Sequence, residues 1–293
     1  MKYTINSENL SVTVSAKGGE NAVYPKANDK TEYLWQGDPS TWPDRALNLF
    51  PYIGRLNNQT YLYQGKKYSL DIHGFLPYKE MQLLQQTPNH LTFCITDTEE
   101  LRKCYPFCFR YLLHYDIDGY QISVTSEIHN QDNKTMYFGI GGHPGFCVPL
   151  EPNLQFEDYI LEFGKICHPD RVIFSENCFV TGEKKSFPLQ NNIQLPLSHN
   201  MFDNDVIVLQ NMEREVTLKS SAGKRGVKVC FPQMEYLGLW HWPKTTANYV
   251  CIEPWSSLSA RVDVIEDLET QEDLISLNAG ETYKNTWTIT ILE

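Results

Sequence analysis

The chain has 293 residues, and its 36 acidic against 25 basic side chains give a formal net charge of −11 at pH 7 and a pI near 5.2. Apolar residues make up 41% of the sequence and aromatic residues 13%, enough to build a sizeable core in one large β domain or two small ones. The negative charge, together with the lack of any long run of Lys and Arg, argues against nucleic acids and acidic membrane surfaces as partners.

The N-terminal segment shows no targeting signal. Its first residues, Met-Lys-Tyr-Thr-Ile-Asn-Ser-Glu-Asn, have no apolar stretch behind the single lysine, and nowhere do about 18 uncharged apolar residues follow one another. We therefore expect an unprocessed cytoplasmic chain without a membrane partner.

Alternation of apolar and polar residues with a period of two dominates the chain. Such alternation predicts antiparallel strands with one buried and one solvated face. Within residues 121–129, for example, Ile122, Val124 and Ile128 point to one side. The predicted strands are, in chain order, residues 10–14, 90–96, 110–116, 121–129, 215–219, 249–253 and 283–292.

Turn signals separate these strands, and the clearest is the Asp118-Gly119 hairpin between two alternating runs. The sequence predicts few helices, with the best candidates at residues 98–104 and 268–277. Many strands with few helices indicate an all-β fold, a large sandwich or barrel. Because no linker, composition shift or fixed repeat interrupts the chain, we expect one domain over residues 1–293, with a boundary near 149–152 as the alternative.

The eight cysteines lie in apolar surroundings and lack the dense, short spacing of a disulfide scaffold. We expect most of them to be small, buried hydrophobic residues. Cys104 and Cys108 form the closest pair, but no second pair of ligands follows nearby, so the sequence predicts no metal site.

Several common catalytic motifs are missing. There is no Walker-type phosphate loop, and the glycines of residues 139–142 run into His143-Pro144, which cannot open a helix cleanly. A Gly-x-Ser-x-Gly elbow and a His-Glu-x-x-His helix are also absent. The sequence therefore gives no sign of nucleotide-dependent chemistry or of the commonest hydrolase mechanisms.

The first cluster of candidate functional residues contains Arg55 and, after a Tyr-rich hairpin, His73. Arg55 offers a forked set of N–H donors, and His73 offers a ring that donates or accepts according to its protonation. The hairpin around residues 65–67 joins their segments, so the two side chains could meet over a sugar-sized ligand. A structural salt bridge at Arg55 and a turn capped by His73 are the alternative.

The second cluster is centred on His143, which stands between Gly142 and Pro144 at the end of a strand of small and apolar residues. Glycine lets a ligand approach the imidazole and proline fixes the backbone, an arrangement that suits a catalytic acid. A buried histidine satisfied by a carbonyl is the alternative. We expect the remaining histidines at the surface or at the rim of a cleft: His90, His114, His129, His168, His199 and His241.

The third cluster is centred on Glu253, which follows an apolar strand and precedes Pro254-Trp255. Burial beside an aromatic wall raises the pKa of a carboxyl group and a neighbouring cation lowers it, so Glu253 is a candidate general base. A salt-bridged glutamate at a strand end is the alternative. Trp240 and Trp242 offer aromatic faces of the kind that stack on a pyranose, although core packing also explains such tryptophans.

Taken in order, these clusters resemble the aldose 1-epimerase (galactose mutarotase) superfamily, in particular its LacX-like branch. The likeness spans almost the whole chain. The segments that carry it are Gly54-Arg55, His73-Gly74-Phe75, Gly142-His143-Pro144-Gly145-Phe146 and Cys251-Ile252-Glu253-Pro254-Trp255.

This resemblance implies a β-supersandwich of large antiparallel sheets and an isomerase that needs no cofactor. It implies that Glu253 removes the proton from the anomeric hydroxyl while His143, on the opposite side of the pyranose, protonates the ring oxygen. It further implies that Arg55, His73 and an aspartate bind the sugar, with Asp205 preferred and Asp203 as the alternative. The expected partner is a small sugar, and the expected assembly is a monomer or homodimer.

The resemblance favours an unphosphorylated aldose or a short oligosaccharide, because Arg55 has no accompanying arginine and Lys79 is more simply explained as a solvated residue. Three alternatives stay open at this point. They are a mutarotase for a phosphorylated hexose, a non-catalytic sugar-binding or sugar-sensing protein, and a polysaccharide lyase on a related sandwich, against which the acidity of the chain argues.

Overall fold

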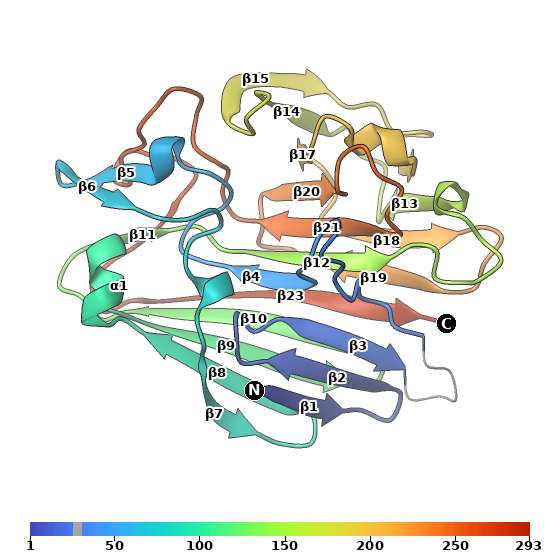
Figure 1. The fold of residues 1–293 in the computed structure, drawn as a ribbon, viewed down its shortest axis with the longest axis horizontal. Coiled ribbons are helices and arrows are strands. Elements are labelled where there is room, and N and C mark those ends of the chain that lie inside the picture. Colours follow the sequence, from blue (N-terminus) through green and yellow to red (C-terminus); the bar gives the residue numbers. More distant parts are fainter. Residues whose placement is uncertain (26–30) are drawn as a thin grey trace.

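The computed structural model describes residues 1–25 and 31–293. Two large antiparallel sheets dominate this part of the chain, so the all-β fold predicted from the alternating pattern is confirmed (Figure 1). All seven predicted strands are present, and most extend by one or two residues beyond the predicted range. No helix in the described ranges is long and apolar enough to cross a membrane.

The larger sheet has nine strands within the described residues, and all of its neighbouring pairs are antiparallel. In spatial order these strands are β16 (Gln194–Pro196), β13 (Tyr159–Phe163), β18 (Glu215–Ser220), β19 (Gly226–Cys230), β23 (Thr282–Leu292), β10 (Gln121–Asn130), β9 (Phe109–Asp118), β8 (His90–Thr96) and β7 (Gln82–Gln86).

The second sheet has seven strands within the same residues. In spatial order they are β15 (Val180–Ser186), β14 (Asp170–Phe174), β17 (Ile207–Gln210), β20 (Tyr236–Trp240), β21 (Tyr249–Trp255), β12 (Gly141–Cys147) and β4 (Ala46–Leu49).

Smaller elements complete the described part of the chain. A three-stranded sheet contains β1 (Lys2–Asn6), β2 (Leu10–Ser15) and β3 (Asn21–Pro25), and two strand pairs are β5 (Thr60–Tyr63) with β6 (Lys66–Ser69) and β11 (Met136–Phe138) with β22 (Ile275–Leu277). The helices are α1 (Glu99–Cys104) and the 3₁₀ turns η1 (Asn57–Gln59), η2 (Leu76–Tyr78), η3 (Phe156–Asp158) and η4 (His199–Phe202).

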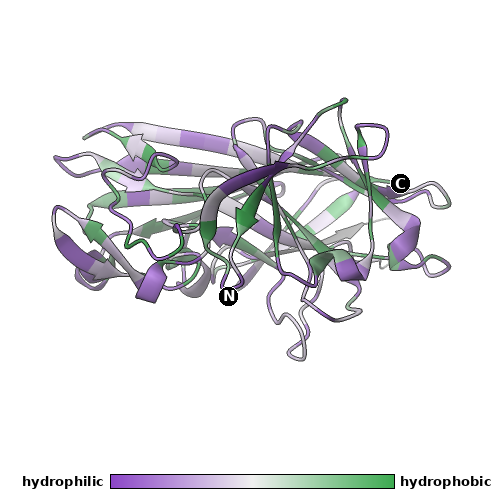
Figure 2. Cartoon of the chain, turned by 90° about the horizontal axis from the view of Figure 1, so that it is seen from above, coloured by the Kyte–Doolittle hydropathy of each residue, from purple (hydrophilic) through white to green (hydrophobic). Residues whose placement is uncertain are grey.

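The two large sheets share one hydrophobic core. Trp287 and Ile289 of β23 and Phe146 of β12 belong to the same cluster of buried side chains. The contact is close, because a Cβ atom added to Gly142 would lie 2.5 Å from the Trp287 ring. Figure 2 shows hydrophobic residues on many inner strands and hydrophilic residues on many peripheral loops, as expected when apolar area is removed from water.

The predicted helix at residues 98–104 is confirmed as α1, whose first turn is capped by Thr98 accepting the Leu101 N–H. The predicted helix at residues 268–277 is wrong. Asp267 organises a turn by accepting the N–H groups of Thr270 and Gln271, and residues 275–277 then pair with β11 as strand β22. Pairing with a strand that is distant in the sequence therefore decides the structure of this segment.

Three further expectations are corrected. The strand at residues 249–253 has no solvated face, because every residue of β21 is buried in the middle of its sheet. His241 is not at the surface: its ring is fully buried and Nε2 contacts the Ala247 carbonyl at 2.8 Å. Only Cys94 and Cys251 are fully buried, whereas the other cysteines are half-buried.

Candidate active site

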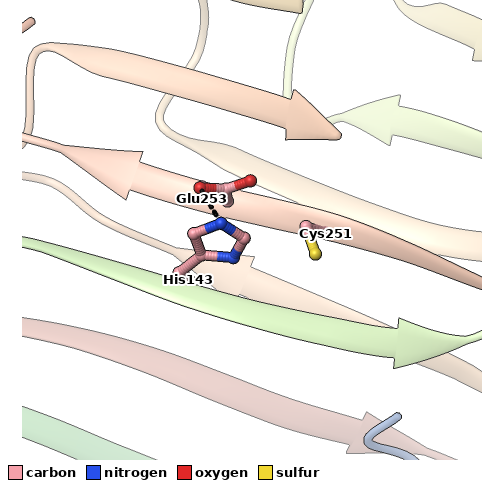
Figure 3. Close-up of side chains that lie close together, drawn as sticks. All are labelled: His143, Cys251 and Glu253. Carbon is pink, nitrogen blue, oxygen red and sulfur yellow. Dashed lines mark ion pairs between the residues drawn. The ribbon is translucent and has the colours of Figure 1, made fainter. Parts of the chain in front are cut away.

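Two neighbouring strands of the seven-stranded sheet hold a histidine and a glutamate side by side. β12 and β21 are antiparallel, and the register that pairs Gly141 with Trp255 places His143 opposite Glu253. His143 Nε2 lies 3.2 Å from Glu253 Oε2, and the two side chains face each other in Figure 3. Residues far apart in the sequence therefore meet because their strands are adjacent.

This arrangement corrects the expectation that the two groups lie on opposite sides of a pyranose. They are neighbours, so both can approach a ligand from one side. The anomeric hydroxyl oxygen and the ring oxygen of a pyranose are bonded to the same carbon atom. An acid and a base that are close together can therefore reach both oxygens.

The pair is almost entirely withdrawn from solvent, with exposed side-chain fractions of 9% for His143 and 1% for Glu253. The 3.2 Å contact is not aligned as a hydrogen bond, and within the described residues neither Glu253 oxygen nor His143 Nδ1 has a hydrogen-bond partner. Because buried polar atoms are usually paired in folded proteins, these atoms are available to a ligand.

Burial also sets the protonation of the pair. Desolvation raises the pKa of Glu253 well above its usual value, and the negative charge of Asp205 raises this pKa further. Desolvation lowers the pKa of His143 well below its usual value, and the nearby His73 lowers this pKa further. Perturbed pKa values in a cavity are typical of groups that transfer protons.

His73 lies next to this pair, with its ring centroid 5.5 Å from that of His143. Its Nδ1 accepts the Gly54 N–H at 3.1 Å, so the neutral ring carries its proton on Nε2. Desolvation, aided by the positive charge of Arg55, lowers the pKa of His73 to about 4. His73 is therefore a neutral N–H donor near pH 7 and does not simply cap a turn.

Arg55 and Asp205 lie at the rim of the same cavity. Arg55 is exposed and forms no ion pair with a carboxylate of the described residues, which argues against the salt-bridge alternative. Asp205 adopts a left-handed backbone conformation with φ of 71°, and its Oδ1 accepts the Val206 N–H at 2.7 Å. Asp203 instead accepts the Lys244 N–H at 3.2 Å and does not line the cavity.

A single cavity of about 240 Å³ brings together all five residues that the sequence singled out. This volume is smaller than the roughly 300–1,000 Å³ of pockets that bind drug-sized molecules, so it suits a small ligand. The lining consists of Trp42, Asp44, Leu47, Gly54, Arg55, Ile72, His73, Tyr78, His143, Phe174, Cys178, Asp205, Val206, Trp240, Trp242, Glu253, Trp255 and Ser259.

Aromatic rings form one wall of this cavity. The Trp42 ring lies 4.9 Å from the His143 ring at an interplanar angle of 30°, and Trp240 meets His143 edge-on at 5.8 Å. Gly145 allows this packing, because a Cβ atom there would lie 2.7 Å from the Trp42 ring. Trp242, at the rim, is 39% exposed. These rings fix the imidazole and offer flat faces to a ligand.

Six polar or aromatic residues of the lining could not be predicted from the sequence: Trp42, Asp44, Tyr78, Phe174, Cys178 and Ser259. None of them lies in a segment with a strong periodic pattern, and only the Pro that follows Trp42 gives a weak local signal. Burial raises the pKa of Asp44, and the positive charge of Lys17 opposes this rise. The tertiary fold, and not a local motif, brings these residues to the cavity.

One set of donor atoms at the floor could hold a metal ion. His143, Cys251 and Glu253 each contribute an atom, and these three atoms lie within 4.8 Å of one another (Figure 3). A nitrogen, a sulfur and an oxygen donor suit a zinc-like cation, which would first displace the proton of the thiol. Burial keeps that proton in place, since it raises the pKa of Cys251 well above its usual value.

Comparisons with known proteins show which family this chain is similar to. A family model described as aldose 1-epimerase matches residues 1–290. The chain is 31% identical to the chromosomal protein LacX of Lactococcus lactis subsp. lactis, and the match covers 100% of both chains.

Two solved structures are similar over nearly their full length. A galactose mutarotase related enzyme from Lactobacillus acidophilus has a TM-score of 0.94 and 30% identity, with 99% of this chain and 97% of that chain covered. A galactose mutarotase-like protein from Lactobacillus casei ATCC 334 also has a TM-score of 0.94, with 26% identity and coverage of 99% and 100%.

Proposed function

The chain belongs to the aldose 1-epimerase family, and we propose that it interconverts the α and β anomers of an unphosphorylated aldohexose by general acid–base catalysis. The observation that carries this proposal is the buried pair of His143 and Glu253, 3.2 Å apart at a cavity of sugar size. Proton transfer by positioned side chains contributes about 10²- to 10⁴-fold to a rate.

In the proposed mechanism, His143 and Glu253 together hold one proton near neutral pH. Their short separation lets this proton move to His143 when a sugar binds, which leaves a carboxylate and an imidazolium. Glu253 then takes the proton of the anomeric hydroxyl, the bond between C1 and the ring oxygen breaks, and His143 protonates that oxygen.

The same two groups close the ring again. After rotation about the C1–C2 bond, His143 takes the proton back from the hydroxyl as its oxygen attacks the other face of C1. Glu253 returns its proton to the former carbonyl oxygen, which yields the opposite anomer. Only protons are exchanged between protein and sugar, so the proposed reaction requires no cofactor.

The remaining cavity residues are proposed to hold the sugar. The neutral His73 ring donates from Nε2, Arg55 donates from its guanidinium and Asp205 accepts from a hydroxyl. Trp242, which is 39% exposed at the rim, stacks on the apolar side of the pyranose, whereas the buried Trp42 packs against the His143 ring. These contacts keep C1 and the ring oxygen beside the acid–base pair.

Charge supports an unphosphorylated substrate. Arg55 is the one Lys or Arg among the lining residues that the structure describes, and it shares the cavity with Asp44 and Asp205. Lys79 does not line the cavity and forms an ion pair with Glu100 at 3.0 Å. A phosphate would meet one cation and two acids, a poor balance for binding a dianion.

Polarimetry on freshly dissolved α-glucose, α-galactose and α-glucose 6-phosphate tests this proposal. The wild type should accelerate the change in rotation for at least one of the two free sugars, and Glu253→Gln should not. Acceleration of the phosphorylated sugar alone would overturn the substrate class. Binding of free sugars without any acceleration would leave a non-catalytic sugar-binding protein.

We place this activity in the cytoplasm. All eight cysteines are free thiols, and free thiols without disulfides are typical of proteins in reducing compartments.

A further inference from the structure

The indole N–H of Trp255 is a hydrogen-bond donor that the fold leaves unused. Trp255 lines the cavity of about 240 Å³ that holds His143 and Glu253, hereafter the inner cavity. The residue is only 4% exposed, and its Nε1 is buried without a hydrogen-bond partner among the described residues. Because buried N–H groups without a partner are rare in folded proteins, a free donor at a cavity indicates a group that it meets during function.

Two glycines fix the Trp255 ring on one face of the seven-stranded sheet. Gly141 of β12 pairs with Trp255, and a Cβ atom at Gly141 would lie 2.8 Å from Cδ1 of the indole. Gly238 lies on β20, the other neighbour of β21, and its Cβ atom would lie 2.9 Å from Cζ2 and 3.2 Å from Cε2. Cδ1 and Cε2 are the two carbon atoms bonded to Nε1. The ring therefore extends from β12 to β20, with its N–H between the two contacts.

The strand register brings this ring to Glu253. Gly238, which the indole covers, pairs with Glu253, and Glu253 and Trp255 are two residues apart on one strand. Side chains at this spacing share a face of the sheet. The indole N–H is close enough to Glu253 to lower the pKa of its carboxyl group, although the contact is not aligned as a hydrogen bond. Rotation of the carboxyl group is enough to align it, because the ring itself is fixed.

The proposed mechanism needs a group that stabilises Glu253 as a carboxylate. Burial raises the pKa of Glu253 and the negative charge of Asp205 raises it further, whereas the indole N–H of Trp255 opposes both effects. Neither carboxylate oxygen has a hydrogen-bond partner within the described residues. The titratable and charged groups around Glu253 are His143, Cys251, Tyr249, His73, Arg55 and Asp205.

We propose that the Trp255 indole N–H donates a hydrogen bond to the Glu253 carboxylate when the shared proton moves to His143. This inference deepens the proposed function and rests on it. A hydrogen bond to a charged acceptor is stronger than one to a neutral acceptor, so the donor favours the carboxylate and imidazolium over the neutral pair. Trp255 acts through Glu253 and is therefore a positioning residue.

Nuclear magnetic resonance of the indole N–H groups tests this inference directly. The chain has six tryptophans, and Trp255→Phe identifies the Trp255 signal in protein with isotope-labelled indole nitrogens. In the wild type this signal should move downfield as pH rises and the pair loses its last proton, because a carboxylate is the stronger acceptor. Glu253→Gln should abolish the movement. A Trp255 signal that ignores pH, or that moves equally in Glu253→Gln, would overturn the inference.

Kinetics give a second test, because Trp255→Phe keeps an aromatic ring and removes the donor. It should lower kcat for anomer exchange about tenfold to a hundredfold, the effect of one hydrogen bond to a charged group. The alkaline limb of the kcat/KM profile, where the pair loses its only proton, should move to higher pH by about 1 to 2 pH units, because the carboxylate loses its donor. A raised KM with the wild-type profile would show a contact with the sugar instead and would overturn the inference.

The matched control is Trp35→Phe, which also removes an indole N–H. Trp35 Nε1 donates to the Trp42 carbonyl at 2.9 Å, and Trp35 does not line the inner cavity. This variant should lower the free energy of unfolding but leave kcat and the pH profile unchanged. Equal shifts of the profile in both variants would show that lost packing, and not a lost donor, moves it, and the inference would fall.

Benzothienylalanine at position 255 separates the donor from the packing, because it has a sulfur atom in place of the N–H and keeps the shape of the ring. It should reproduce the pH profile of Trp255→Phe, and a wild-type profile would contradict the inference.

Failure of the proposed function is distinguishable from failure of this inference. If no sugar is turned over, a Trp255 signal that follows pH in the wild type but not in Glu253→Gln still supports the hydrogen bond, while the enzymatic proposal falls. Turnover by a wild type whose Trp255 signal is independent of pH would overturn the hydrogen bond and leave the enzymatic proposal standing.

Discussion

Two histidine–glutamate pairs of this protein have the same chemistry in opposite surroundings. His143 and Glu253 are 3.2 Å apart on the central strands β12 and β21, and their exposed fractions are 9% and 1%. His199 and Glu157 are 2.7 Å apart at the 3₁₀ turns η4 and η3, and Glu157 is 51% exposed. Both pairs satisfy the geometric definition of an ion pair.

The surroundings shift the pKa values of the two glutamate carboxyl groups in opposite directions. In Glu157, partial burial raises the pKa, but the hydrogen bonds from His199 and from backbone N–H groups outweigh burial and leave the pKa below its usual value. In Glu253, burial dominates and raises the pKa well above its usual value. A short distance between a base and an acid therefore does not by itself distinguish the two pairs, and it is burial beside the cavity that supports the proposed role of His143 and Glu253.

Removal of either partner of the buried pair should have the largest effect on activity. His143→Asn and Glu253→Gln should each lower kcat for anomer exchange about 10²- to 10⁴-fold, because each removes one proton-transfer group. The double variant should be little worse than either single variant, since the two residues act as a unit. Polarimetry measures all three.

The outer pair supplies the matched controls, His199→Asn and Glu157→Gln. Both should keep the wild-type rate, because neither residue lines the inner cavity. If these variants lost as much activity as His143→Asn, the loss of activity would reflect damage to the fold and not the removal of a proton-transfer group.

At the rim of the inner cavity, Arg55 should affect sugar binding more than the proton transfer. Arg55→Ala should raise KM and lower kcat/KM about tenfold to a hundredfold, because a charged hydrogen bond to the sugar is lost while the acid–base pair stays intact. Arg214→Ala is the control, since Arg214 pairs with Glu235 away from the cavity. Steady-state kinetics on the preferred sugar would contradict the assignment if KM were unchanged.

A third prediction uses His73, whose pKa of about 4 in the folded state lies below the usual value of 6.5. Between these pH values the unfolded chain binds more protons at this residue, so the free energy of unfolding should fall as pH drops from 6.5 to 4. Asparagine tolerates the φ of 63° at this position. Over this pH interval the His73→Asn variant should therefore lose roughly 1–3 kcal/mol less of its free energy of unfolding than the wild type. Urea titrations at pH 7 and 4.5 measure the difference, and equal losses would refute it.

The smallest expected effect is on stability. Replacing Glu253 and Glu157 by glutamine should change the free energy of unfolding in opposite directions. The raised pKa of Glu253 means that its contribution to stability declines as pH rises above 4.5, so Glu253→Gln should be at least as stable as the wild type at pH 7. Because the pKa of Glu157 is lowered in the folded state, its carboxylate stabilises the fold at pH values above the pKa that it has in the unfolded chain. Glu157→Gln should therefore lower the free energy of unfolding at pH 7 by at most about 1 kcal/mol.

Urea denaturation at pH 7 checks this difference in sign. A strongly destabilised Glu253→Gln would show that the buried carboxyl group has a structural role, and a stabilised Glu157→Gln would show that the outer pair does not stabilise the fold.

The alternating strands could be predicted from the sequence because each buried face imposes its own periodicity, as in β10 and β23. The helix predicted at residues 268–277 failed because strand pairing with β11, which lies far away in the sequence, decided that segment. Complete burial of β21 was also invisible locally, since it depends on both neighbouring strands and on the facing sheet.

The cavity residues also divide into those that the sequence could predict and those that only tertiary contacts decide. His143 and Glu253 stood out because Gly and Pro neighbours mark unusual backbone, and the register then placed them together. Trp42 could not be predicted, because its ring fits only where Gly145, far away in the sequence on strand β12, lacks a side chain. The sequence preferred Asp205 but left Asp203 as an alternative, because the left-handed turn that directs Asp205 to the cavity is a tertiary feature.

The most direct test of catalysis by His143 and Glu253 is the pH dependence of kcat/KM for anomer exchange in the wild type, Glu253→Gln and Glu157→Gln. A pair that must hold one proton loses activity when it gains a second proton or loses its only one, so the wild type should give a bell-shaped profile. Glu157→Gln should reproduce that profile, and Glu253→Gln should be low at every pH. A flat wild-type profile, or a Glu253→Gln variant that matches the wild type, would contradict catalysis by the buried pair.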